Sequence, residues 1–105
     1  MASLLDEREI YLPIPVWFEL LTGANRKNAP SLKSELSALP KLYPHRSTWK
    51  TIESWIEIAR RKGEQFGFVD LLIAAIAKEN DCTLWTLDDD FKRMSHLKFL
   101  KVKDL

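Results

Sequence analysis

The chain has 105 residues, which is enough for one compact domain and excludes a second domain of ordinary size. Hydrophobic residues make up 46% of it and charged residues 30%, a composition that supports a buried core and excludes an intrinsically disordered chain. Lys and Arg number 16 against 15 Asp and Glu, so the formal charge of +1 excludes a globally basic nucleic-acid-binding surface, and any RNA contact must come from local patches.

The compartment can also be inferred from the sequence. Cys82 is the single cysteine, so no internal disulfide can form, which suggests a reducing cytosol. No segment approaches the roughly 18 apolar residues that span a bilayer. Asp6 and Glu7 come early, and a basic start is missing, unlike in a signal peptide. We therefore expect one cytoplasmic domain over residues 1–105, without membrane contact.

The first elements are short. Residues 4–9 resemble the end of a helix, and residues 10–13 predict a strand closed by a proline that cannot donate to a ladder. Pro15 suits the first turn of a helix that continues through residues 16–21 and ends at Gly23.

The next stretch is more polar. Residues 25–30 predict a loop, after which Ser31 is expected to cap a short helix that reaches about Leu39. Pro40 and Pro44 then bracket an irregular connector.

A longer helix follows. Ser47 or Thr48 is its expected cap, and it reaches Lys62 and ends at Gly63. Helical spacing predicts an apolar stripe on this helix, made of Trp49, Ile52, Ile56 and Ala59 and widened by Trp55 and Ile58.

The last third alternates helix and strand. Residues 68–77 are apolar on nearly every face, which indicates a buried helix. Residues 82–86 form a strand without a polar face, as in a parallel sheet covered on both sides. A short helix over residues 88–94 and a strand over residues 97–102 complete an α/β layer fold.

Several acids stand in apolar surroundings. Asp70 lies inside the most apolar helix, where an ionised carboxylate needs a cap role or a matching cation. Glu19 is surrounded by Trp17, Phe18, Leu20 and Leu21, although it could simply face solvent. Asp88, Asp89 and Asp90 follow a strand directly; such a triplet can cap a helix, but α/β sheets also place their sites there.

Together these acids suggest a carboxylate cluster that holds Mg²⁺ or Mn²⁺, because oxygen ligands favour hard cations. Such an ion polarises a phosphate and generates hydroxide near neutral pH. The positive charge for an RNA phosphate could come from Arg60, Arg61, Lys62, Lys92 and Arg93, although basic runs are often solvated faces.

Three segments resemble the acidic motifs of PIN domains of the VapC type. Residues 10–23, with their Glu-Leu-Leu-x-Gly core, resemble the second motif, residues 67–75 the third, and residues 84–91 the fourth. The resemblance implies a PIN-like three-layer α/β fold with a short parallel sheet. It also implies that Glu19, Asp70 and Asp88 are catalytic and that Glu19, Asp70, Asp88 and Asp90 bind the metal.

The family's first motif has no counterpart here. That motif is a strand ending in Asp-Thr or Asp-Ser, and Asp6 lies in a different, helix-like context. We therefore expect a PIN-like domain that lacks the first central strand, with two open hydrogen-bonding edges in its sheet. A misassigned start, a decayed gene or a partner that fills the gap would each explain this.

Three functions follow. The first is a Mg²⁺-dependent single-strand endoribonuclease, the toxin of a toxin–antitoxin system, whose partners are RNA, a cognate antitoxin and a second copy of the chain. The second is a catalytically inactive PIN-like remnant that binds antitoxin or dimerises. The third drops the family and keeps a generic α/β interaction domain whose partner-facing helix carries Trp49 and Trp55, although core packing would also explain these tryptophans.

Overall fold

A five-stranded sheet forms the centre of the protein, in the strand order β3-β2-β1-β4-β5. The computed structural model describes residues 3–6 and 9–104, with side chains described over residues 10–104. Four strands run parallel to one another, and β1 runs antiparallel to both of its neighbours. The strands are β1 (Ser3–Asp6), β2 (Glu9–Pro13), β3 (Lys41–Leu42), β4 (Thr83–Trp85) and β5 (Lys101–Lys103).

The position expected to be empty at the sheet centre is filled by β1. Leu4 pairs with Tyr11 of β2 on one side and with Leu84 of β4 on the other. The prediction that residues 4–9 end a helix is therefore wrong, and so is the prediction of two open edges. Backbone groups of β2 and β4 need partners, and only two residues separate β1 from β2, which permits an antiparallel hairpin but not a parallel crossover.

The described residues form five helices besides this sheet: α1 (Ile14–Gly23), α2 (Ala29–Leu36), α3 (Thr48–Arg61), α4 (Phe68–Glu79) and α5 (Asp89–His96). The helices predicted after residue 13 are confirmed, with shifted bounds: α2 begins at Ala29 after the N-cap Asn28, so Ser31 lies inside it, and it ends at Leu36 rather than at about Leu39. The last strand covers Lys101–Lys103, later than the predicted residues 97–102. The connector between the prolines contains β3, which pairs with β2 and was missed. Among the described helices, none has the length and apolar character needed to cross a bilayer.

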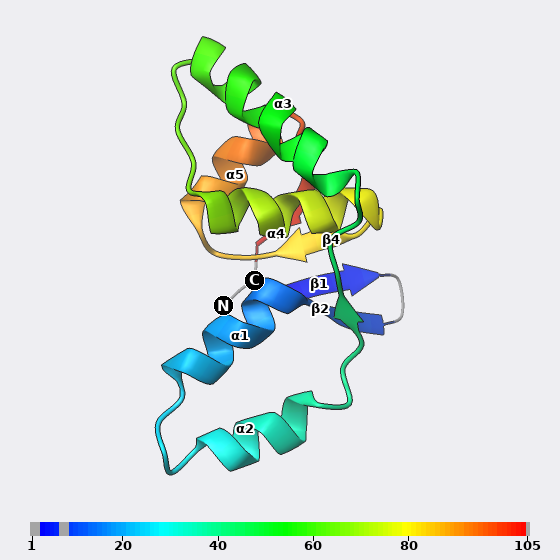
Figure 1. Cartoon of the computed structure of the whole chain (residues 1–105), viewed down its shortest axis with the longest axis vertical. Helices are drawn as coiled ribbons and strands as arrows, with labels where there is room; N and C mark the ends of the chain where they lie inside the picture. Colours follow the sequence, from blue (N-terminus) through cyan, green and yellow to red (C-terminus); the bar gives the residue numbers. More distant parts are fainter. Residues whose placement is uncertain (1–2, 7–8, 105) are drawn as a thin grey trace.

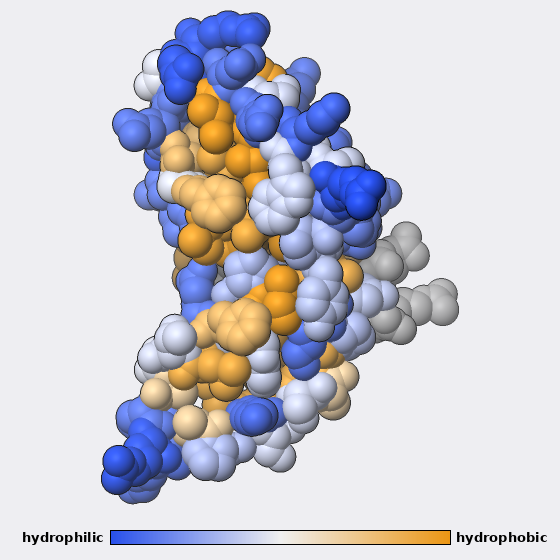
Figure 2. All heavy atoms as spheres, viewed as in Figure 1, coloured by the Kyte–Doolittle hydropathy of each residue, from blue (hydrophilic) through white to orange (hydrophobic). Residues whose placement is uncertain are grey.

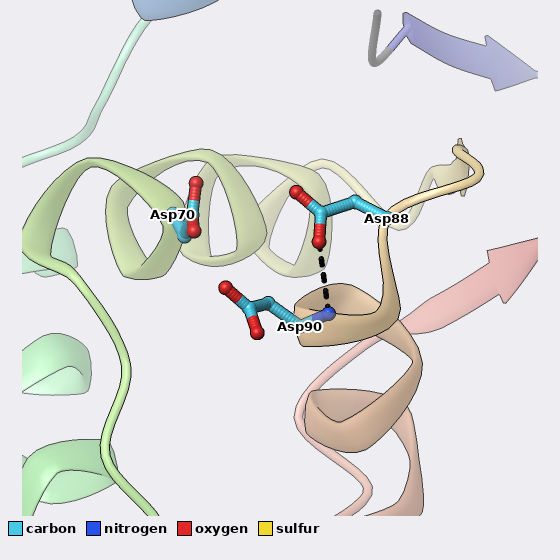
Figure 3. Close-up of side chains that lie close together, drawn as sticks. All are labelled: Asp70, Asp88 and Asp90. Atoms are coloured by element: carbon cyan, nitrogen blue, oxygen red, sulfur yellow. Dashed lines mark hydrogen bonds between the residues drawn. The ribbon is translucent and has the colours of Figure 1, made fainter.

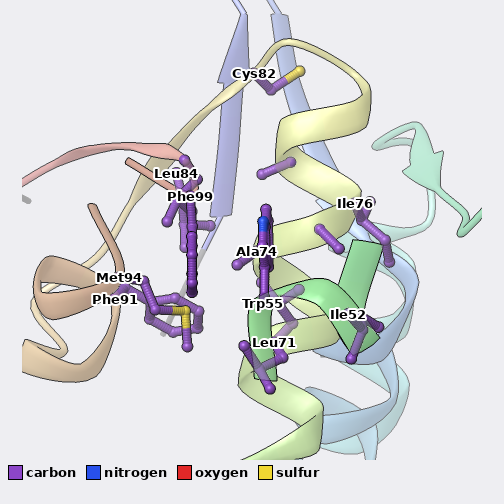
Figure 4. Close-up of a cluster of buried hydrophobic side chains, with 14 of the residues drawn as sticks. Ile52, Trp55, Leu71, Ala74, Ile76, Cys82, Leu84, Phe91, Met94 and Phe99 are labelled. Atoms are coloured by element: carbon purple, nitrogen blue, oxygen red, sulfur yellow. The ribbon is translucent and has the colours of Figure 1, made fainter. Parts of the chain in front are cut away.

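Helix α4 is the central element of the packing. It lies between α3 and the sheet, with α1 along one side and α5 behind it (Figure 1). The predicted buried character is confirmed, because its residues Leu71, Ile73, Ala74, Ala75, Ile76 and Ala77 are all buried. Small alanines on this helix let its neighbours approach closely, so the position of α4 is fixed from several sides (Figure 4).

The apolar stripe of α3 differs from the prediction. Ile52, Trp55 and Ala59 are buried, whereas Trp49 and Ile56 are exposed. Trp55 stacks on Phe99 with ring centroids 4.5 Å apart and planes within 4° of parallel. The stripe that faces α4 is therefore centred on Trp55, and the interpretation of this tryptophan as partner-facing is wrong.

A polar contact joins the start of α3 to the end of α4. The carboxylate of Glu79, at the end of α4, accepts hydrogen bonds from the hydroxyls of Ser47 and Thr48 at the start of α3. A negative charge near a helix N-terminus is favourable, because it opposes the positive end of the helix dipole. The beginning of α3 is thus attached to the end of α4.

The two tryptophans of α3 provide a test of this packing. We expect Trp55→Ala to lower the free energy of unfolding by about 3 kcal/mol or more, because it opens a cavity beneath Phe99. Trp49→Ala on the same helix, at a side chain 47% exposed, should change it by no more than about 0.5 kcal/mol. Urea unfolding followed by circular dichroism measures both, and equal losses would contradict the assigned orientation of α3.

Candidate metal centre

The chain segment after β4 is shaped by two local hydrogen bonds. Thr86 is buried; its backbone N–H donates to the carbonyl of Lys103 (3.0 Å), and its Oγ1 accepts from the backbone N–H of Asp88 (3.0 Å). Asp88 is the N-cap of α5, and its Oδ1 accepts from the backbone N–H of Asp90 at 2.9 Å. The predicted cap role of this acidic triplet is confirmed for Asp88, and one of its carboxylate oxygens is left for other contacts.

Asp70 reaches the same place from α4. It is the third residue of the helix, whose N-cap is Gly67. The interpretation of Asp70 as an N-cap is therefore wrong. Its side chain is half-buried in the first turn, where the helix dipole favours a negative charge.

The carboxylates of Asp70, Asp88 and Asp90 converge. Each offers an oxygen, and these oxygens all lie within 4.8 Å of one another. Figure 3 shows the three side chains around one gap between the start of α4 and the start of α5. Acids that are up to 20 residues apart in the chain thus meet because both helices begin at the same edge of the sheet, as expected for an α/β fold.

This convergence has an electrostatic cost. Burial raises the pKa of the Asp70 carboxyl above its usual value, and the negative charges of Asp88, Asp90 and Glu19 raise this pKa further. The native state therefore binds more protons than the unfolded chain. Stability falls as the pH rises from about 4, the unfolded pKa, through the raised native pKa. Without a cation, the carboxyl of Asp70 is therefore less favourable to the fold at neutral pH than at pH values below about 4.

Glu19 stands slightly apart from the other three acids. It lies on α1 and lines a cavity of about 360 Å³ together with Asp70 and Asp88. Apolar side chains complete much of the wall, namely Val16, Leu20, Ile73, Leu87 and Phe91. Among the described residues, the group whose oxygens meet within 4.8 Å does not include Glu19. The structure thus brings Glu19, Asp70 and Asp88 to one cavity, and it brings Asp70, Asp88 and Asp90 into direct proximity.

An ion-pair network behind Asp90 was not predicted. Arg93 donates from Nη2 to Oδ1 of Asp90 at 2.6 Å and from Nη1 to Oε2 of Glu64. These contacts raise the pKa of Arg93, the hydrogen bond to Asp90 most of all. The spacing of three residues between Asp90 and Arg93 on one helix could have indicated their contact. Nothing in the sequence indicates Glu64, which lies 29 residues before Arg93.

The five cations suggested for RNA phosphates differ in availability. Arg93 is engaged as above, Lys92 pairs with Asp104 (3.3 Å), and Arg61 pairs loosely with Glu57 (3.9 Å). Within residues 10–104, Arg60 and Lys62 form no ion pair and are exposed at the end of α3. The end of α3 is therefore the more accessible source of positive charge.

The backbone register explains why Asp6 cannot join the cluster. Ser3 pairs with Trp85 at the end of β4, whereas Leu5 pairs with Thr83 at its beginning. Asp6 pairs with Glu9 and so lies at the edge of the sheet opposite to Asp88. The role of the family's first aspartate is therefore not carried by Asp6, as the sequence predicted.

The repulsion around Asp70 gives a stability prediction. In metal-free buffer at neutral pH, Asp70→Asn should raise the melting temperature by a few degrees, because it removes a charge that the neighbouring acids oppose. The gain should vanish as the pH is lowered towards 4. Asp81→Asn is the matched control; Asp81 follows the other end of α4 in a left-handed conformation (φ 51°) that asparagine tolerates. Differential scanning calorimetry measures both, and a lower melting temperature for Asp70→Asn would contradict the assigned electrostatics.

Comparisons with known proteins agree with this fold. The model of the PIN domain family matches residues 1–97. One similar chain comes from the crystal structure of VapBC2 from Rickettsia felis bound to a DNA fragment from the VapBC2 promoter. The two chains superpose with a TM-score of 0.77 at 26% sequence identity, and the match covers 91% of this chain and 74% of that one. A chain of VapBC-1 from nontypeable Haemophilus influenzae superposes with a TM-score of 0.77 at 21% sequence identity. This match covers 96% of this chain and 78% of that one. No curated protein matches. This chain therefore belongs to the PIN domain family.

Proposed function

We propose that this protein is a Mg²⁺- or Mn²⁺-dependent endoribonuclease that cleaves single-stranded RNA in the cytoplasm, as the toxin of a toxin–antitoxin system. The observation that carries the proposal is the convergence of Asp70, Asp88 and Asp90 within 4.8 Å. Membership of the PIN domain family and the likeness to VapBC chains support a toxin-like PIN protein.

The donor set fits a hard divalent cation. All three candidate ligands are carboxylates. Burial raises the pKa of Asp70, and the neighbouring negative charges raise it further by a repulsion that a cation would relieve. Asp70, Asp88 and Asp90 would hold the ion, with Glu19 contributing from the α1 side of the cavity. When bound, a divalent cation supplies Lewis-acid polarisation of a phosphoryl oxygen and lowers the pKa of water.

The residues around the ion site have distinct tasks in this proposal. One oxygen of Asp88 is occupied by the N–H of Asp90, and one oxygen of Asp90 by Arg93, so each carboxylate is oriented and keeps one oxygen for the cation. Glu19 is exposed at the cavity, where its oxygens can accept hydrogen bonds from an attacking water. The apolar walls limit competing water. Catalysis then consists of orientation and charge stabilisation.

Contacts to the RNA backbone are assigned to the end of α3. The connection that follows this helix end leads towards the site, because Glu64, three residues after Arg61, contacts Arg93 and thereby Asp90. Arg60 and Lys62 are exposed there, and their charge can offset phosphate repulsion by the acids. This local patch is compatible with the net charge of +1.

An apolar surface around the cavity supports the antitoxin as a partner. Phe18 precedes Glu19, Phe68 and Val69 precede Asp70, and Leu87 precedes Asp88, and all four are exposed. Figure 2 shows apolar side chains on both sides of the hollow between the α3/α4 half and the α1/α2 half. Exposed apolar patches of this kind favour binding of a peptide segment.

A homodimer remains part of the proposal because the resemblance to the family implies one. The two open hydrogen-bonding edges predicted from the sequence do not support a dimer, since β1 lies between β2 and β4.

The inactive remnant remains a second candidate because of one observation. In the described part of β1, the residue at the acidic edge is Ser3, so β1 brings no acid to the site. With one carboxylate fewer than the family pattern, the cation could bind more weakly. Calorimetry with Mn²⁺ separates the two functions, because binding at micromolar metal argues against an empty site.

Cleavage of RNA is the direct test of the proposed activity. The purified protein should cut a fluorescently labelled single-stranded RNA with Mg²⁺ or Mn²⁺, and not in EDTA. Asp70→Asn and Asp88→Asn should each lose more than about 100-fold in rate, beyond the roughly 10–100-fold typical of residues that only support metal ligands. Asp81→Asn, at the far end of α4, should keep the activity of the parent protein.

Three outcomes of this assay would contradict the nuclease. These are intact RNA with both ions present, cleavage that persists in EDTA, and equal activity of Asp70→Asn and the parent. Intact RNA combined with micromolar Mn²⁺ binding and antitoxin capture would favour a binding protein instead.

A further inference from the structure

A chain of charges leads away from the candidate metal centre. Asp90 contacts the guanidinium of Arg93 through Nη2 (2.6 Å), and the same guanidinium contacts Glu64 through Nη1. Glu64 lies in the connection between α3 and α4, and its carboxylate is not among the three that converge. One guanidinium therefore bridges an acid inside the cluster and an acid outside it.

The bridge is held in a fixed orientation. The guanidinium of Arg93 lies over the ring of Phe66, 4.9 Å from its centroid. The rings of Phe66 and Phe99 pack edge to face, with their centroids 6.4 Å apart. Phe99 itself stacks on Trp55 in the core. The planar fork of arginine suits such a two-carboxylate bridge, whereas lysine offers only a point charge.

A permanent positive charge beside a metal ligand has two opposing effects. It offsets the repulsion among the three carboxylates when no cation is bound, but it also repels an incoming cation and competes for the oxygen of Asp90. Glu64 changes this balance, because its negative charge largely cancels that of Arg93. Its pull on Nη1 also prevents the guanidinium from turning both nitrogens towards Asp90.

We propose that Glu64 is a positioning residue of the metal centre: it neutralises Arg93 and confines it to one oxygen of Asp90, which leaves Asp90 free to share a cation with Asp70 and Asp88. This inference rests on the proposed metal-dependent function. It assigns to Glu64 an effect on cation affinity although its carboxylate is not among the three that converge.

Glu64 could act by balancing the charge of Arg93 or only by bracing the loop, and these two roles predict different Mn²⁺ affinities for the single and double variants. If Glu64 acts through the charge of Arg93, Glu64→Gln weakens Mn²⁺ binding, and Glu64→Gln combined with Arg93→Gln recovers most of the loss because both charges disappear together. If the pair only braces the loop, then Glu64→Gln, Arg93→Gln and the double variant all weaken binding alike. The double-mutant cycle therefore separates the two.

The experiment is calorimetric titration of the parent protein and the three variants with Mn²⁺ alone, at low and at high salt. We expect Glu64→Gln to bind about tenfold more weakly, at the low end of what supporting residues contribute. We expect the double variant to be much closer to the parent, and the difference to shrink at high salt, because screening weakens charge effects. Glu57→Gln is the control for the loss of one glutamate charge, since Glu57 forms only a loose, exposed pair with Arg61 on α3 (3.9 Å).

Unchanged affinity in Glu64→Gln would overturn the inference, and so would a double variant as weak as Glu64→Gln. Melting temperatures in EDTA show that every variant is folded before titration. Failure of the parent protein itself to bind Mn²⁺ would overturn the metal step of the proposed function and this inference with it. Parent binding with no effect of Glu64→Gln overturns the inference alone.

Discussion

The repulsion among Asp70, Asp88 and Asp90 is the interaction around which the functional edge of this protein is organised. Their oxygens lie within 4.8 Å of one another, and the pKa of Asp70 is raised by burial and then further by the neighbouring negative charges. Carboxylates in solution would separate, so the fold must hold them. It does so because α4 is packed on several sides and because the N-cap bond of Asp88 fixes the start of α5. The destabilisation is offset by the buried core, and a divalent cation would relieve it.

The direction of the strands decides which acids can meet. β2 and β4 run parallel, so α1 and α5 both begin at the same edge of the sheet and bring Glu19 and the Asp88 segment together. β1 occupies the centre in the opposite direction and satisfies the backbone groups of both neighbours. The same reversal carries Asp6 to the far edge. β1 therefore pairs with strands on both of its sides, and the residue of its described part that lies nearest to the end of β4 is Ser3 rather than an acid.

Much of the candidate site could be predicted from local features of the sequence. Asp70 within an apolar helix and Asp88 directly after a buried strand are conspicuous because their surroundings disfavour charge. The order of the elements then places both at one edge. What could not be predicted depends on contacts between distant segments. Three features depend on tertiary partners that no local pattern specifies: the antiparallel direction of β1, the pairing of Glu64 with Arg93, and the rotation of α3 that buries Trp55.

The central claim is that one cation joins the three carboxylates, and paramagnetic broadening tests it most directly. In ¹⁵N-labelled protein, a small fraction of an equivalent of Mn²⁺ should broaden the amide signals of residues 69–71 and 87–91 first, followed by those around Glu19. Signals near Asp81, an exposed acid at the far end of α4, should stay sharp at the same ratio. Broadening that begins at Asp81, or that spreads evenly over the exposed acids, would contradict a shared metal centre.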